Sequence, residues 1–170
     1  YHPATLVKDA QRHGITVHPA DVNHSGWRCR WEAGGFRIGL SYVHGLRQAA
    51  GETIEAERAR RPFTDTAELA TRCGLGADQL SLLAEVGALA SLGLTRRQAL
   101  WQVAEVAGRH GPLLARLPPE EHSPLPEMTP FDETIADYSG LHLTTGPHLM
   151  AYLRADLERG GVLPLASLDA

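Results

Sequence analysis

The spacing of apolar residues changes near residue 43, and this change constrains the fold more than any other feature of the chain. Before it, Trp27, Cys29 and Trp31 alternate with arginines, and Gly34-Gly35 separates this stretch from the next extended one. Alternation at a period of two is typical of half-buried strands. After it, apolar residues recur at helical spacing. The pattern predicts a mainly α fold with a small antiparallel β-layer near the N-terminus.

Start and stop signals divide the helical part of the chain. Proline is favoured in the first turn of a helix, glycine just after its end, and a small polar residue immediately before it. Thr95 and Gln98 have the spacing of a capping box, in which each side chain binds the other's backbone N–H group. These signals predict helices after Pro3, over residues 47–60, after Thr64 or Asp65, around Leu80 to Val86, after Thr95, after Thr129-Pro130 and after Gly146-Pro147.

Four segments follow from these patterns. Residues 108–127 are rich in proline and glycine and open an acidic excess, so we interpret them as a linker. The segments are 1–42 with the β-layer, 43–107 with paired helices, the linker 108–127, and a helical segment 128–170. The start at Tyr1 suggests a fragment of a longer protein.

Composition narrows the function classes. The chain has no apolar run of membrane-spanning length and no secretory signal, and its two cysteines fit no CxxC pattern, so we expect free thiols and a cytoplasmic location. The formal net charge is −4, but residues 1–117 carry +3 and residues 118–170 carry −7. A contact with a polyanion is therefore expected in the first two-thirds of the chain.

Two short turns carry the candidate function. Val43-His44-Gly45-Leu46 fits an apolar-x-Gly-apolar turn between helices, and a second turn contains Gly87 and Ala88. In a helix-hairpin-helix module, the N–H groups of such a turn and of the following helix bind a phosphate without reading sequence. The proposed first contact is Gly45, Leu46, Arg47 and Gln48, and the second is Gly87 and Ala88. Each glycine alone also fits an ordinary connection between helices.

Longer stretches resemble one protein family. The segment from Gln11 to Trp31 is similar to part of the bacterial C-family (DnaE-type) DNA polymerase III α subunits. Gly87-Ala-Leu, Arg96-Arg-Gln-Ala-Leu-Trp and Thr144-Thr-Gly-Pro-His extend the resemblance, the last two toward the error-prone (ImuC-like) branch. Replicative members carry a clamp-binding peptide after the hairpins, and residues 108–128 show none. The resemblance runs from the end of the fingers region to the passage before an OB domain.

The resemblance implies a non-catalytic segment of an error-prone translesion polymerase that holds primer-template duplex through its phosphates. Non-specific attraction is expected from Lys8, Arg12, Arg96 and Arg97. The parent polymerase is expected to use Mg²⁺ in a palm domain that this chain lacks.

Two alternatives stay open. One is a module that docks accessory proteins of a mutagenic repair complex through Leu149, Leu153 and Leu157, and the other is the same region of a replicative polymerase.

No catalytic or metal-binding residue is expected within this chain. Histidine pairs such as His18/His24 and His142/His148 lack the i, i+4 spacing of helical ligands, and neither a phosphate-binding Gly-x-x-x-x-Gly-Lys loop nor a nucleophile elbow occurs. Trp27, Trp31 and Phe36 are predicted to lie in the core, with stacking on bases as the alternative.

Overall fold

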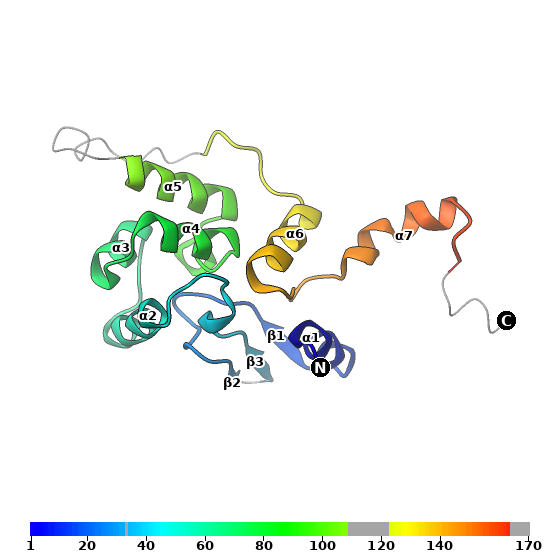
Figure 1. Ribbon diagram of the computed structural model, residues 1–170, viewed down its shortest axis with the longest axis horizontal. Coiled ribbons are helices and arrows are strands. Elements are labelled where there is room, and N and C mark those ends of the chain that lie inside the picture. The colour runs from blue at the N-terminus through cyan, green and yellow to red at the C-terminus, as the bar shows by residue number, and fades with distance from the viewer. Residues whose placement is uncertain (33, 109–122, 164–170) are drawn as a thin grey trace.

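The computed structural model describes residues 1–32, 34–108 and 123–163. The mainly α architecture predicted from sequence is confirmed (Figure 1). The predicted linker 108–127 lies largely outside the described residues. The elements are α1 (Pro3–Arg12), β1 (Thr16–His18), β2 (Arg30–Glu32), β3 (Gly35–Arg37), the 3-10 helix η1 (Leu40–Tyr42), α2 (Gln48–Arg60), α3 (Thr66–Cys73), α4 (Ala77–Glu85), the 3-10 helix η2 (Ala90–Leu92), α5 (Arg96–Gly108), α6 (Pro130–Leu141) and α7 (Leu149–Arg159).

Helix starts follow the signals in the sequence. Asp65 caps α3, its carboxylate accepting from the Glu68 N–H at 2.7 Å. The capping box before α5 is present: the Thr95 N–H donates to Gln98 Oε1 at 2.9 Å, and the Gln98 N–H donates to Thr95 Oγ1 at 3.3 Å. A further capping box at Thr129 opens α6. These caps satisfy N–H groups that the helices themselves leave unpaired.

The small sheet is mixed, which corrects the expected antiparallel layer. Its strand order is β1-β3-β2, with β2 antiparallel to β3 and β1 parallel to β3. The hairpin between β2 and β3 was recognisable from its Gly34-Gly35 turn. The parallel pair arises because residues 19–29 carry the chain across the molecule before β2 begins, so β3 returns in the direction of β1.

The three aromatic side chains near the sheet do not all lie in the core. Trp31 is 70% exposed and stacks on Phe36, with ring centroids 6.5 Å apart, so its predicted core position is wrong. Trp27 is partly buried and packs against Gly51 of α2, where an added Cβ would lie 2.3 Å from the indole. Strand β2, which carries Trp31, lies at the edge of the sheet and pairs with β3 on one side.

One continuous core joins the N-terminal segment to the helices. It extends from Val7 of α1 through Val22, Ile54 and Leu83 to Leu143, which follows α6. The boundary predicted at residues 42/43 therefore does not separate two cores. Helix α7 has no buried residue and reaches away from this body in Figure 1. No helix among the described residues is both long and apolar enough to cross a membrane.

Candidate nucleic-acid interface

The first turn has the geometry of a tight hairpin. Gly45 adopts a φ of +81°, a left-handed conformation that glycine tolerates without strain. The Leu46 N–H donates to the Val43 carbonyl at 3.1 Å and closes the turn, while the Leu46 side chain is buried. An added Cβ on Gly45 would lie 3.2 Å from Leu82 Cδ1, so the turn approaches α4 closely. The turn predicted at residues 43–46 is present, and it lies between the 3-10 helix η1 and α2.

A glutamine of α4 clamps this turn. Gln79 is buried, and its Oε1 accepts from the Arg47 N–H at 3.0 Å. Its Nε2 donates to the Gly45 carbonyl at 3.3 Å. The same side chain thus holds both ends of the turn, which fixes its position on the helical body. The hydrogen bonds use the Arg47 N–H, so that group does not point a free donor at solvent.

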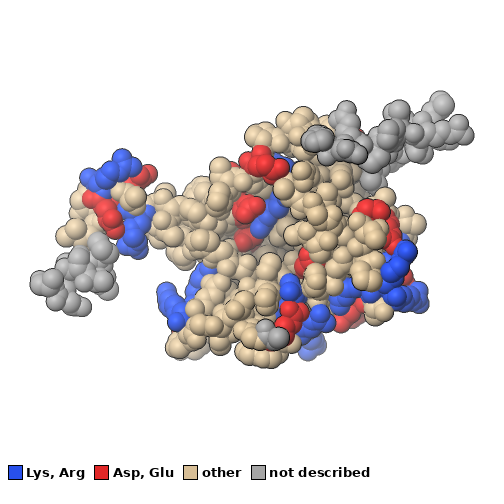
Figure 2. Space-filling view, turned by 180° about the vertical axis from the view of Figure 1, so that it is seen from behind, with Lys and Arg blue, Asp and Glu red and all other residues tan. Residues whose placement is uncertain are grey.

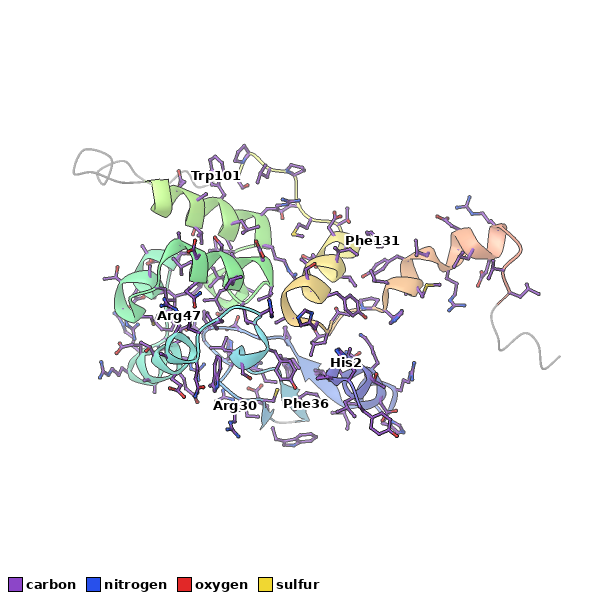
Figure 3. All side chains as sticks on the ribbon, in the orientation of Figure 1. His2, Arg30, Phe36, Arg47, Trp101 and Phe131 are labelled. Atoms are coloured by element: carbon purple, nitrogen blue, oxygen red, sulfur yellow. The ribbon has the colours of Figure 1, made fainter. Side chains whose placement is uncertain are left out.

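The start of α2 is open to solvent. Arg47 occupies the N-cap position without a side-chain capping bond, and Arg47, Gln48 and Ala49 are all exposed. The Gln48 side chain donates to Glu52 at 2.7 Å, further along the same helix. The first N–H groups of a helix have no partner within it and carry the positive end of its dipole. Together with the Arg47 guanidinium (Figure 3), this end of α2 suits an anion.

The second turn is closed by internal bonds. Gly87 has a φ of +74°, as a hairpin glycine should. Ala88, however, is 0% exposed; its N–H donates to the Leu83 carbonyl at 2.8 Å and its carbonyl accepts from the Val22 N–H at 2.9 Å. The N–H of Ser91 donates to the buried Asp21 carboxylate at 3.0 Å. This turn packs inside the molecule. Because Ala88 is buried there, it is not placed for direct contact with DNA.

Arg96 lies beneath the second turn and not on a free surface. Its guanidinium forms an ion pair with Asp137 of α6 at 2.6 Å, and the two side chains are 15% and 10% exposed. It also donates to the carbonyls of Glu85 and Glu133 at 3.1 and 3.2 Å. An arginine whose two terminal nitrogens are both engaged by carboxylate and carbonyl oxygens has less positive charge to offer a phosphate. We therefore do not carry Arg96 into the DNA-binding proposal.

The other basic candidates lie apart from the first turn. Lys8 is partly buried and donates to the Gly146 carbonyl and, at 3.0 Å, to Gln11 Oε1, and burial lowers its pKa. Arg12 is exposed in the last turn of α1. Arg97 is partly buried on α5. Figure 2 shows basic and acidic side chains interleaved over one face of the molecule, with no single basic field.

Two groups of residues at the first turn escaped sequence reasoning. Gln79 lies 32 residues from Arg47 along the chain, and no local pattern marks a glutamine as the partner of a distant turn. His44 and His142 come together across 98 residues, with ring centroids 5.1 Å apart. Within the described part of the chain, no cluster of three or more His, Cys, Asp or Glu side chains is suited to hold a metal ion.

The sequence is similar to that of known proteins. The family model for the helix-hairpin-helix motif matches residues 14–99, which include both turns. Error-prone DNA polymerases are similar over nearly the whole chain: that of Alkalilimnicola ehrlichii is 41% identical over 99% of the chain, that of Azoarcus sp. 40% over 99%, and that of Bordetella parapertussis 42% over 92%. The chain spans only 17%, 17% and 16% of these relatives. It therefore belongs to the helix-hairpin-helix family and is homologous to one segment of the error-prone DNA polymerases.

Proposed function

We propose that this chain is a non-catalytic DNA-binding segment of an error-prone translesion polymerase, which holds primer-template duplex through backbone phosphates at the first turn. The open start of α2 beside Gly45 carries the proposal, because uncapped N–H groups and Arg47 converge there. The similarity to error-prone polymerases supports a place within such an enzyme. Nucleotidyl transfer with Mg²⁺ would then belong to parts of a longer, cytoplasmic polymerase outside this segment.

The proposed DNA contact includes fewer residues than the sequence analysis expected. Gly45, Leu46, Arg47 and Gln48 form it, with Leu46 acting as the buried anchor of the turn. Gly87 shapes the second turn, which packs against residues 21–22. Lys8, Arg12 and Arg97 remain candidates for weak, non-specific attraction that depends on salt.

Fluorescence anisotropy with primer-template duplex across a salt series tests the proposal. The double variant Gly45→Val with Arg47→Glu removes the left-handed glycine and reverses the charge, so duplex affinity should fall at least tenfold at low salt. The matched control is Gly74→Val with Arg60→Glu. Gly74 is another left-handed glycine, and Arg60 is an exposed arginine at the far end of α2.

The control should bind nearly as well as the wild type, with circular dichroism showing that both variants are folded. Equal losses in the two variants would show that the contact is not at the first turn. A wild-type affinity that does not change with salt would overturn phosphate binding altogether.

A docking role is the second candidate, and the exposure of α7 favours it. Leu153 and Met150 are each 41% exposed, and Leu149 and Leu157 are only partly buried. The apolar side of α7 formed by Leu149, Leu153 and Leu157 is therefore not covered by the rest of the described structure, as expected for a surface that binds an accessory protein. If it binds such a protein, Leu153→Glu should abolish that complex in a titration with purified accessory protein and leave duplex affinity unchanged. Error spectra of the full-length polymerase would distinguish an error-prone polymerase from the replicative alternative.

A further inference from the structure

A cavity of about 520 Å³ opens beside the first turn. Its wall includes three histidines from three separate parts of the chain: His2 before α1, His44 within the turn, and His142 after α6. Tyr42 and Trp27 contribute aromatic surface. No Asp, Glu, Lys or Arg is among the lining residues. The cavity is thus rich in imidazoles and free of carboxylates.

The His44 and His142 rings form an edge-to-face pair with unused nitrogen atoms. Their planes meet at 63°, and both residues are exposed. Within the described residues, neither ring makes a hydrogen bond. The backbone fixes the pair, because the His44 N–H donates to the Gly140 carbonyl at 2.7 Å at the end of α6. His142 caps that helix at a φ of 56°, a left-handed conformation that is uncommon for residues other than glycine.

His2 presents a third donor to the same cavity. Its Nδ1 accepts from the Ala4 N–H at 3.2 Å, which requires a lone pair on that nitrogen. The proton of the neutral ring is therefore on Nε2, where it can be donated to a ligand.

We propose that His44 and His142, with His2 beside them, bind a second phosphodiester of the duplex that the first turn holds. This inference rests on the proposed function. His44 is the residue before Gly45, so a phosphate in the cavity lies next to the one at the start of α2. Neutral imidazoles donate hydrogen bonds to phosphate oxygens, and protonated ones add charge. Trp27 and Tyr42 on the same wall leave the imidazoles as its ionisable donors at neutral pH.

The site predicts a pH dependence that arginine contacts cannot produce. Imidazoles gain charge as the pH falls toward 6, whereas Arg47 stays charged throughout. Tyr42, the other titratable group on the wall, stays neutral because burial raises its pKa. Duplex affinity should therefore be about threefold to tenfold higher at pH 6 than at pH 8, with a steeper salt dependence by about one log-log unit.

Anisotropy titrations at pH 6 and pH 8 test this inference in the 170-residue chain. The test variant is His44→Gln with His142→Asn, because asparagine tolerates the left-handed backbone. The control is His13→Gln, an imidazole with a 71% exposed side chain at the end of α1, outside the cavity. The double variant, which keeps His2, should lose most of the pH difference, and the control should keep the wild-type difference.

Three outcomes would overturn the inference. The first is an unchanged pH difference in the double variant, and the second is a pH difference seen only with single-stranded DNA of equal length. The third is an absence of duplex-induced shifts in the imidazole proton resonances of His44 and His142 in the wild type, a measurement that does not depend on how the variant folds. The proposed function would survive all three, because it is judged at pH 8 by Gly45→Val with Arg47→Glu.

Discussion

Replacing Gln79 by methionine should loosen the first turn without changing the core volume. The amide of Gln79 makes two hydrogen bonds, with the Arg47 N–H and the Gly45 carbonyl, and methionine fills the same space without either. Because Gly45 and Arg47 are themselves exposed, water can replace the lost partners, so no full penalty for buried unpaired groups applies. The expected loss is about 1 kcal/mol per hydrogen bond, or about 2 kcal/mol in the free energy of unfolding.

Thermal and urea denaturation followed by circular dichroism would measure this loss. For a chain of this size, about 2 kcal/mol corresponds to a fall in Tm of roughly 4–8 °C. Duplex affinity should fall as well, because the turn is no longer held in its binding geometry.

The same substitution at Gln48 is the control. That side chain is exposed and bonds only to Glu52 on its own helix, so Gln48→Met should change stability by less than about 0.5 kcal/mol. If Gln79→Met is as stable as Gln48→Met, the reasoning that one buried amide positions the turn is refuted.

Three further predictions concern the helical body. Arg96→Met removes the ion-pair partner of the Asp137 carboxylate, which keeps only its hydrogen bond from Thr144, and should destabilise the fold by about 3 kcal/mol in urea denaturation, with duplex affinity within twofold of wild type. Gly51→Ala places a Cβ 2.3 Å from the indole that packs on it and should cost about 1–3 kcal/mol by the same assay. Cys73 should resist a thiol-alkylating reagent at pH 8 because burial raises its pKa to about 11, and mass spectrometry should locate the label on exposed Cys29.

Each of these has a result that would contradict it. A large loss of duplex affinity in folded Arg96→Met would return that arginine to the DNA contact. Gly76→Ala is the control for the glycine, because nothing lies within 4 Å of its added Cβ; equal effects would exclude steric overlap as the cause. Labelling of Cys73 at the same rate as Cys29 in the native chain would show that the thiol is not protected.

The sequence predicted local structure well and long-range contacts poorly. Capping at Asp65 and Thr95 involves residues three apart in the chain, so the helix starts could be located without a structure. The β2–β3 hairpin is equally local. The β1–β3 pairing depends on how residues 19–29 cross the molecule, which no periodic pattern reveals.

The candidate site divides in the same way. Gly45 and Gly87 were recognisable as turn glycines, and both have positive φ. Their different surroundings were not recognisable: the first turn is clamped by a distant glutamine and left open, whereas Asp21 and Val22 close the second. Arg96 was read as free charge because its partner Asp137 is 41 residues away.

Helix α6 contacts both turns. Asp137, near its end, holds Arg96 beneath the second turn, and three residues later Gly140 holds the backbone of His44 in the first. Less than one helical turn of α6 therefore contacts both hairpins, in addition to α4, which holds the first turn through Gln79 and leads into the second. One residue inserted between these anchors would rotate one against the other by about 100° about the helix axis. The proposed DNA contact at the first turn thus depends on a backbone anchor in α6, a helix that lies outside the matched hairpin region, residues 14–99.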